Sequence, residues 1–167
     1  PLGADRAGEG ADGGSSVATP NTAVYGLSGR AVQAVAGAVT RWTSTSGTRP
    51  AWLSQQVPGV SNLWAPDISY FGGQYHLYYS ASTFGSNHSC IGHLTRPALS
   101  SGTWTDRGQV ICSNATGNDN WNAIDPNIIT DGKRNPWMSF GSWWGGIKLV
   151  KLDSTMKVAE PEQWYTI

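Results

Sequence analysis

Residues 123–127 read Ala-Ile-Asp-Pro-Asn, and residues 140–144 read Phe-Gly-Ser-Trp-Trp about one hairpin later. This spacing brings one carboxylate, Asp125, close to a group of aromatic side chains. A carboxylate handles protons and accepts hydrogen bonds from hydroxyl groups, and flat rings stack on the apolar faces of sugars. The combination is the one that a site for binding and cleaving a saccharide requires.

A similar arrangement lies one repeat earlier in the chain. Asp67 precedes the turn Gly72-Gly73 and an aromatic strand, just as Asp125 precedes the turn Asp131-Gly132 and a second aromatic strand. We therefore expect Asp67 and Asp125 to occupy equivalent places. The period of roughly 55–60 residues is the length of one blade of a β-propeller.

The elements that position these residues are predicted to be short strands separated by Gly, Asn and Asp turns, which is the all-β pattern. No segment has a convincing amphipathic helical period. The expected strands are 68–71, 75–81, 90–95 and 109–112 in one blade, and 128–129, 137–141 and 146–152 in the next, with Trp164 beginning an outer strand.

The chain divides into two parts by composition. Residues 1–40 contain a Gly-, Ala-, Ser- and Asp-rich stretch with few large apolar residues, so we expect this segment to be disordered or without assigned structure. Residues 41–167 are predicted to form one partial propeller domain. Two or three blades do not close a ring, because closure that removes the exposed edges takes at least about four.

Charge and composition exclude several classes of partner. The 167 residues carry no net charge and no Lys/Arg run, which argues against nucleic acid or an anionic membrane surface. No stretch reaches the roughly 18–20 apolar residues of a membrane span. Nine Trp and six Tyr suit a neutral sugar, although about half of them are expected in blade cores. A secretory signal, if there was one, has been removed or lies outside this chain.

The remaining candidate residues for chemistry give few signals. Cys90 and Cys112 would lie on neighbouring strands, where either a disulfide or two buried thiols is expected. His76, His88 and His93 lack metal-ligand spacing and are expected at surface or strand positions that point in different directions. Neither a phosphate-binding loop nor a paired Ser or Cys nucleophile is present, so no organic cofactor is predicted.

Several ordered motifs together resemble a known family. They are Asn-Leu-Trp-Ala-Pro-Asp at 62–67, Tyr-Tyr-Ser at 78–80, Phe-Gly-Ser-Asn at 84–87, Ile-Gly at 91–92, Trp-Thr-Asp-Arg-Gly at 104–108, Asn-Ala-Ile-Asp-Pro-Asn at 122–127 and Phe-Gly-Ser-Trp-Trp-Gly-Gly-Ile at 140–147. Residues 49–152 are similar to the endo-1,5-α-L-arabinanases of glycoside hydrolase family 43. The resemblance implies a secreted, five-bladed propeller, here about two to three blades, that hydrolyses α-1,5-linked arabinan with inversion, and we expect a monomer.

The family uses three acidic residues, and the resemblance carries over only one of them. Asp125 matches the acid that tunes pKa values and orientation. The His-Asp-Pro motif of the general base is missing before Trp64, and Glu160 and Glu162 are expected on the surface rather than at the general acid's place. The chain is therefore expected to lack both base and acid, either as a fragment of an enzyme, which we favour, or as a degenerate product.

The remaining site residues follow from the same resemblance and from the internal repeat. A Ca²⁺ ion is known in the family's channel, but the residues that hold it are not expected in this chain. Trp64 could equally pack inside a blade, and the loop at 84–87 is expected beside the rim. The predicted substrate-binding residues are Asn122, Ala123, Ile124, Ser142, Trp143, Trp144, Trp64 and Asp67.

Two other functions remain open at this point. One is a carbohydrate-binding propeller that has kept the aromatic channel without the acid and base. The other is a related exo-acting arabinofuranosidase or xylosidase. Finding a His-Asp-Pro motif upstream and a channel-facing Glu downstream in the complete gene would favour an enzyme.

Overall fold

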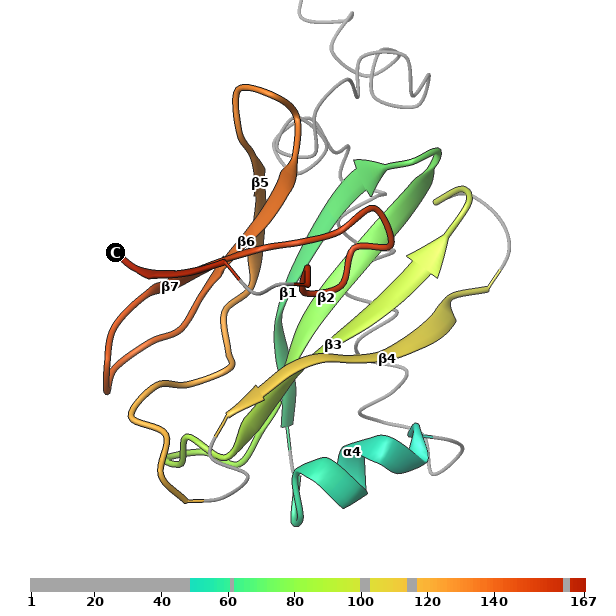
Figure 1. The fold of residues 1–167 in the computed structure, drawn as a ribbon. Helices are drawn as coiled ribbons and strands as arrows, with labels where there is room; N and C mark the ends of the chain where they lie inside the picture. Colours follow the sequence, from blue (N-terminus) through green and yellow to red (C-terminus); the bar gives the residue numbers. More distant parts are fainter. Residues whose placement is uncertain (1–48, 61, 100–102, 114–116, 161–162) are drawn as a thin grey trace, which may run out of the picture.

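The computed structural model describes residues 49–60, 62–99, 103–113, 117–160 and 163–167 (Figure 1). The expectation of disorder for residues 1–40 lies outside these ranges. The described residues form two four-stranded antiparallel sheets, each with its strands in chain order, that lie side by side. The all-β class is confirmed, and each predicted repeat forms one sheet.

The first sheet is built from long strands joined by tight turns. Its first hairpin turns at Gly72 and Gly73, whose φ angles of 57° and 82° are those of a two-residue turn that glycine adopts without strain. Its strands are β1 (Asn62–Phe71), β2 (Gln74–Ser82), β3 (Ser89–Arg96) and β4 (Thr105–Ser113). The predicted 68–71 strand is thus six residues longer at its start.

The second sheet has shorter strands and a turn fixed by one side chain. Asp131 accepts hydrogen bonds at Oδ1 from the backbone N–H groups of Lys133 and Asn135, at 2.8 and 2.9 Å. The strands are β5 (Asn127–Thr130), β6 (Pro136–Phe140), β7 (Lys148–Lys151) and β8 (Trp164–Thr166). The predicted strand at 146–152 is therefore confirmed in its central part.

A helix that the sequence did not predict precedes the first sheet. Helix α4 (Ala51–Gln56) buries only Leu53 and lies against β3 and β4 (Figure 1). Six residues are too few to show a 3.6-residue period, which explains why the sequence pattern did not reveal this helix. No helix in the described ranges is long and apolar enough to cross a membrane.

The core lies in two layers, one under α4 and one between the sheets. Leu53 of α4 packs with Leu77 and Tyr79 of β2. On the other face of β2, Tyr78 packs against Ile128 and Met138 of the second sheet. Alternate residues of β2 therefore serve different layers, as the period of two in a strand dictates.

Cys90 and Cys112 form a disulfide between β3 and β4. Of the two alternatives left open by the sequence, the crosslinked one is found. The bond joins facing residues of adjacent antiparallel strands, and Cys90 is buried.

His76 lies in β2 and His93 in β3, which confirms the expected strand positions, but the prediction that these side chains point in different directions is wrong. His76 and His93 lie on adjacent strands, point to the same face and are hydrogen-bonded and stacked with a ring-centroid distance of 5.0 Å. His76 pairs with Thr95 and His93 with Tyr78, so the two histidines are diagonal neighbours in the β2–β3 pairing. Their common face follows from this register, which the sequence pattern alone did not give.

The expected equivalence of Asp67 and Asp125 is also wrong. Each sheet has an irregularity at its first strand. In the first sheet Trp64 pairs with Ser80 and Asp67 with Tyr78. In the second sheet the carbonyl of Ile124 accepts from Gly141, and Asn127 pairs with Ser139.

The two irregularities align by their prolines rather than by their aspartates. The residue before the proline has a positive φ in both sheets, 44° at Ala65 and 54° at Asp125. Asp125 is therefore equivalent to Ala65, and Asp67 is equivalent to Asn127. An alignment that pairs the two Asp residues is two positions out of register, which moves Asp67 to a different place along its strand.

Candidate saccharide-binding site

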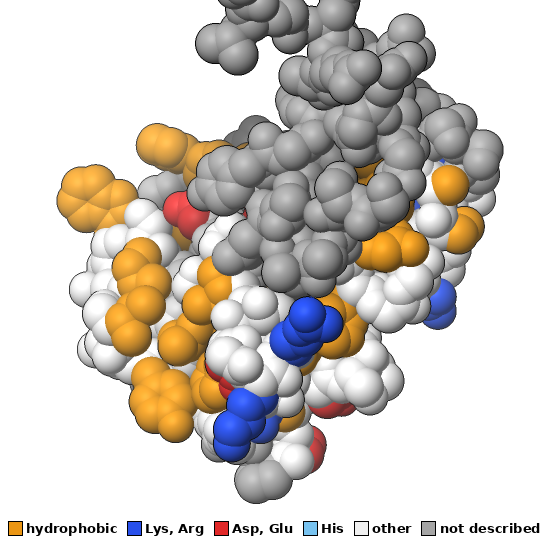
Figure 2. All heavy atoms as spheres, turned by 90° about the horizontal axis from the view of Figure 1, so that it is seen from above, with side chains coloured by type: hydrophobic (Ala, Val, Ile, Leu, Met, Phe, Trp, Pro, Cys, Tyr) orange, Lys and Arg blue, Asp and Glu red, His pale blue; other side chains and the backbone are white. Residues whose placement is uncertain are grey.

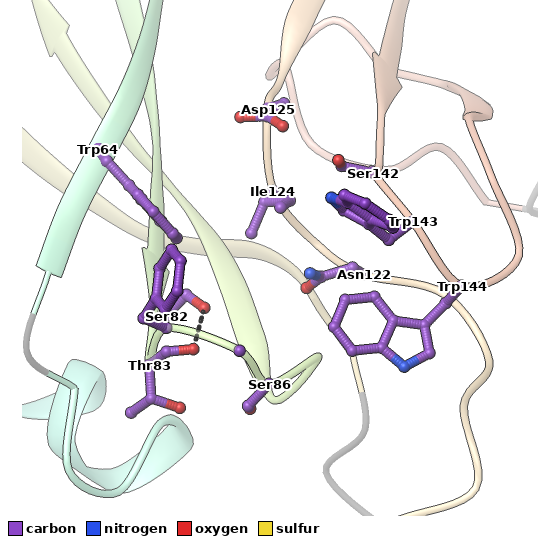
Figure 3. A pocket seen from close by; sticks show the side chains of 12 residues that line it. Trp64, Ser82, Thr83, Ser86, Asn122, Ile124, Asp125, Ser142, Trp143 and Trp144 are labelled. Carbon is purple, nitrogen blue, oxygen red and sulfur yellow. Dashed lines mark hydrogen bonds between the residues drawn. The ribbon is translucent and has the colours of Figure 1, made fainter.

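A pocket of about 590 Å³ lies between the two sheets, at the ends of β1, β2 and β6 (Figure 3). Four chain segments meet there, two from each sheet: Trp64 and residues 82–86 from the first, and residues 122–125 and 142–144 from the second. The lining residues are Trp64, Ser82, Thr83, Phe84, Gly85, Ser86, Asn122, Ile124, Asp125, Ser142, Trp143 and Trp144.

One wall of the pocket is formed by Trp64 and Phe84 of the first sheet. Their ring centroids lie 6.2 Å apart with the planes inclined by 55°. Phe84 sits in a tight turn closed by a hydrogen bond from Ser86 N–H to the carbonyl of Thr83, at 3.3 Å. With 83% of its surface exposed, the Phe84 ring is available to a ligand.

Trp143 and Trp144 form the opposite wall (Figure 3). Both have left-handed backbone angles, with φ of 58° and 42°, which are unusual for bulky side chains. The turn is closed by a 2.8 Å hydrogen bond from Gly146 N–H to the carbonyl of Trp143. Such strain persists only where the surroundings enforce it, and it recurs at ligand sites.

The segment that leads into β5 lies between these walls and carries the polar groups. Asn122 is 2% exposed, and its Oδ1 has no hydrogen-bond partner among the described residues. The residue Asp125 as a whole is exposed to solvent. Its carboxyl group is nevertheless partly desolvated by its surroundings, and this raises the pKa of the carboxyl group above 3.8. Its backbone N–H donates to Ser80 Oγ at 2.9 Å.

The electrostatics of the pocket suit a neutral ligand. Among the described residues that line the pocket, Asp125 alone has an ionisable side chain. The surrounding rings, hydroxyls and one amide offer apolar faces together with hydrogen-bond donors and acceptors. In the view of Figure 2 the surface likewise shows few charged side chains among hydrophobic and neutral ones.

Most of the residues predicted for the site come together in this pocket. Ala123 does not line it, because its side chain is fully buried in the core between the sheets. Asp67 is also absent from the lining; it is 7% exposed and accepts a hydrogen bond from Ile128 N–H. The predicted residues that line the pocket are Trp64, Asn122, Ile124, Asp125, Ser142, Trp143 and Trp144.

Ser82 and Thr83 line the pocket although sequence reasoning did not select them. Ser82 Oγ donates to the carbonyl of Thr83 at 3.1 Å and accepts from Ser89 Oγ at 2.9 Å. The signal that could have identified them is their place between the aromatic strand and the Phe-Gly-Ser-Asn turn.

The described ranges offer no group of three or more His, Cys, Asp or Glu side chains that could hold a metal ion.

Comparison with known proteins places this geometry in a family. The model for "Glycosyl hydrolases family 43" matches residues 37–166. The chain belongs to glycosyl hydrolase family 43. Within this family it is 53% identical over 121 residues to the extracellular endo-α-(1→5)-L-arabinanase 1 of Bacillus subtilis, covering 70% of this chain and 37% of that protein.

Two further proteins are similar to this chain, one by sequence and one by structure. The extracellular exo-α-(1→5)-L-arabinofuranosidase ArbA of Cellvibrio japonicus is 47% identical over 127 residues, 72% of this chain and 36% of that protein. The solved structure of a native Bacillus subtilis arabinanase superposes with a TM-score of 0.68 and 50% identity, covering 74% of this chain and 42% of that chain. The chain therefore spans somewhat over a third of the length of these curated family 43 relatives.

Proposed function

We propose that this chain forms part of the substrate-binding cavity of an enzyme that hydrolyses α-1,5-linked arabinan. The observation that carries the proposal is the pocket itself, which has aromatic rings on two walls and, among its described lining residues, the carboxylate of Asp125 as the single ionisable group. Relatives named for the same linkage, both endo- and exo-acting, support the substrate class.

The sugar would lie between the two aromatic walls. Furanose rings have apolar faces that pack against Trp and Phe rings, and hydroxyl groups at their edges. The Oδ1 of Asn122, which has no hydrogen-bond partner within the described ranges, would accept from one such hydroxyl, and this relieves the cost of a buried acceptor without a partner. Ser142, which precedes Trp143 and Trp144, adds a hydroxyl group that can also form a hydrogen bond with the sugar.

Asp125 would act by tuning and orienting a proton donor rather than by attacking the sugar. An ionised carboxylate near a second acid disfavours ionisation of that acid, raises its pKa and keeps it protonated near neutrality. The inverting reaction also needs an acid and a base about 6.5–9.5 Å apart. In the proposal these two groups come from residues other than those that line the pocket here.

The proposed architecture is a five-bladed propeller in which this chain forms two blades. Ile91 and Ile111 of the first sheet pack into the core against the second sheet. The corresponding residues of the second sheet are Ile147 and Ile167, which are 40% and 67% exposed. The second sheet thus presents, at equivalent positions, the kind of apolar face with which the first sheet contacts its neighbour.

The proposal includes secretion. The relatives named above are described as extracellular. The disulfide between Cys90 and Cys112 fits an oxidising compartment, where such bonds persist. We further propose a monomer and no organic cofactor.

The test is binding and cleavage of linear arabinan. Isothermal titration calorimetry with linear α-1,5-linked arabino-oligosaccharides should show binding by this chain, at least about tenfold weaker for Phe84→Ala and Asn122→Ala. Tyr165→Ala is the matched control, because Tyr165 is 51% exposed but lies outside the pocket lining. Binding that Tyr165→Ala weakens as much as Phe84→Ala would contradict the assignment of this pocket.

Activity is measured as release of reducing ends from debranched arabinan, beside an Asp125→Asn variant. Because a relative at 47% identity is named as exo-acting, the products also decide between the two modes. A range of oligomer lengths indicates endo action, and one short product from the start indicates exo action. Because the proposal places the general acid and base outside the lining residues, binding without cleavage is expected of this chain by itself. Binding without cleavage by a version extended to the full reading frame would favour a carbohydrate-binding role.

A further inference from the structure

The segment from Asp119 to Asp125 lies between the two sheets and is hydrogen-bonded on both sides. Toward the second sheet, the carbonyl of Ile124 accepts from Gly141 N–H at 2.7 Å, and the carbonyl of Asn120 accepts from Gly145 N–H. These two even-numbered carbonyls are thus held by the loop that carries the two Trp residues.

The odd-numbered residues are held by side chains of the first sheet and its loop. Asn87 Nδ2 donates to the carbonyl of Asp119 at 2.7 Å and to that of Trp121 at 3.1 Å. Ser113 Oγ accepts from Ala123 N–H at 2.9 Å and donates to the carbonyl of Asn87 at 2.6 Å.

Ser80 of the first sheet makes a hydrogen bond of the same kind with Asp125, the carboxylate of the pocket. Its Oγ accepts from Asp125 N–H at 2.9 Å, and the side chain of Ser80 is completely buried. Buried in this way, the hydroxyl has a fixed place in the first sheet, so the contact ties the backbone of Asp125 to that sheet.

Asp67 holds the other side of the same turn. Its Oδ2 accepts from Ile128 N–H at 3.1 Å, and its Oδ1 accepts from Asn127 Nδ2 at 3.3 Å. Asp125 lies between these anchors with a φ of 54° just before a proline, where an extended conformation is preferred. A backbone in a conformation of this kind needs support from its surroundings.

We propose that Ser80 and Asp67 are positioning residues for Asp125, through which the first sheet sets the place of the Asp125 carboxyl group in the pocket. The inference rests on the proposed function of Asp125. It goes further because it assigns a role to two side chains that do not line the pocket. The second sheet carries Asp125, but side chains of the first sheet fix it.

The test measures Asp125 itself by NMR in the full 167-residue chain, so it needs neither sugar nor catalysis. In Ser80→Ala, we expect exchange of the Asp125 amide proton to become about five- to tenfold faster, as the loss of one buried hydrogen bond implies. The carboxyl pKa of Asp125 should also move toward 3.8, because the released turn gains solvent.

Ser69→Ala is the matched control. Ser69 is a fully buried serine of the same sheet whose Oγ has no hydrogen-bond partner among the described residues. It should leave both the amide exchange and the carboxyl titration of Asp125 unchanged. Ser80→Cys, which keeps a side chain of similar size but a weaker acceptor, should change both quantities in the same direction and by less.

The results separate this inference from the proposed function. Unchanged exchange and titration of Asp125 in a folded Ser80 variant, or equal changes in Ser69→Ala, would overturn the positioning role. If Ser80→Ala does not fold, the same criteria apply to Ser80→Cys. Failure of the wild-type chain to bind arabino-oligosaccharides would overturn the proposed function and leave these NMR results as they stand.

Discussion

His76 Nδ1 and His93 Nε2 lie 2.9 Å apart, and His76 Nε2 lies 3.0 Å from the carbonyl oxygen of Phe71. Because a carbonyl only accepts, the proton of His76 is on Nε2, and its Nδ1 accepts from His93 Nε2. His93 Nδ1 has no partner in the described part of the chain. The pair is therefore held in the neutral form.

The free energy of unfolding should fall when the pH is lowered into the range in which His76 and His93 of the unfolded chain become protonated. Burial lowers the pKa of both, and the nearby Arg107 acts in the same direction on both. Below about pH 6.5 the unfolded chain binds protons that the folded chain does not, so each histidine lowers stability by up to about 1.4 kcal/mol per pH unit.

Urea denaturation at pH 7.5 and pH 5.5 measures this effect. His93→Phe keeps a ring that stacks on Tyr78, whose centroid lies 4.6 Å from that of His93, and removes one titrating group. We expect this variant to lose less stability than the wild type between the two pH values. An equal loss would show that His93 is not the source of the acid sensitivity.

Asp67 should have the opposite pH dependence. Burial raises the pKa of this carboxyl to about 6 in the folded chain. Since the folded state then holds a proton that the unfolded state has lost, its contribution is present below about pH 4 and is lost as the pH rises to about 6. The size of the effect is at most about 3 kcal/mol.

The variant Asp67→Asn isolates this contribution. Its stability relative to the wild type should be higher at pH 8 than at pH 4, as measured by urea denaturation at both values. The histidines contribute equally to both proteins and cancel in the difference. A relative stability that does not depend on pH would mean that Asp67 ionises normally in the folded chain.

Loss of the disulfide should destabilise the first sheet. The bond between Cys90 and Cys112 closes a loop with a sequence separation of 22. Its removal is expected to cost about 3 kcal/mol, largely through the freedom that the unfolded chain regains. Thermal unfolding of the wild type should therefore shift downward on addition of a reductant, whereas the double Cys→Ala variant should not respond to it.

Gly92 is predicted to be intolerant of a side chain. A Cβ at this position would meet the ring of Tyr79 at 2.2 Å, and the Tyr79 side chain is itself buried, with 1% of its surface exposed. Gly92→Ala should lower the free energy of unfolding by about 1–3 kcal/mol through overpacking.

The matched control for Gly92 is Gly132→Ala. At Gly132 a methyl group would have nothing within 4 Å, and the backbone angle is an ordinary one. Denaturant titration of both variants should show a loss only for Gly92→Ala. Because a Gly→Ala change restricts the unfolded chain and so favours folding at an unstrained position, a comparable loss in Gly132→Ala would contradict the assignment of the cost to the contact with Tyr79.

The sequence was informative where the physical signal is local. Strand order and the aromatic strands follow from a period of two and from turns such as Gly72-Gly73, whose backbone angles glycine adopts without cost. The motif around Asp125 also carried the family resemblance. Helix α4 was missed because six residues are too few to show a period.

What the sequence by itself determined is the all-β class, the two repeats and most of the pocket residues. Only the tertiary structure decided that Asp67 accepts hydrogen bonds from Asn127 and Ile128 instead of lining the pocket, and that His76 contacts His93. The physical reason is register. A shift of the strand pairing by one residue turns a side chain to the other face of the sheet, and a shift by two residues moves it to the next position on the same face. Register is set by contacts between segments that are distant in the sequence.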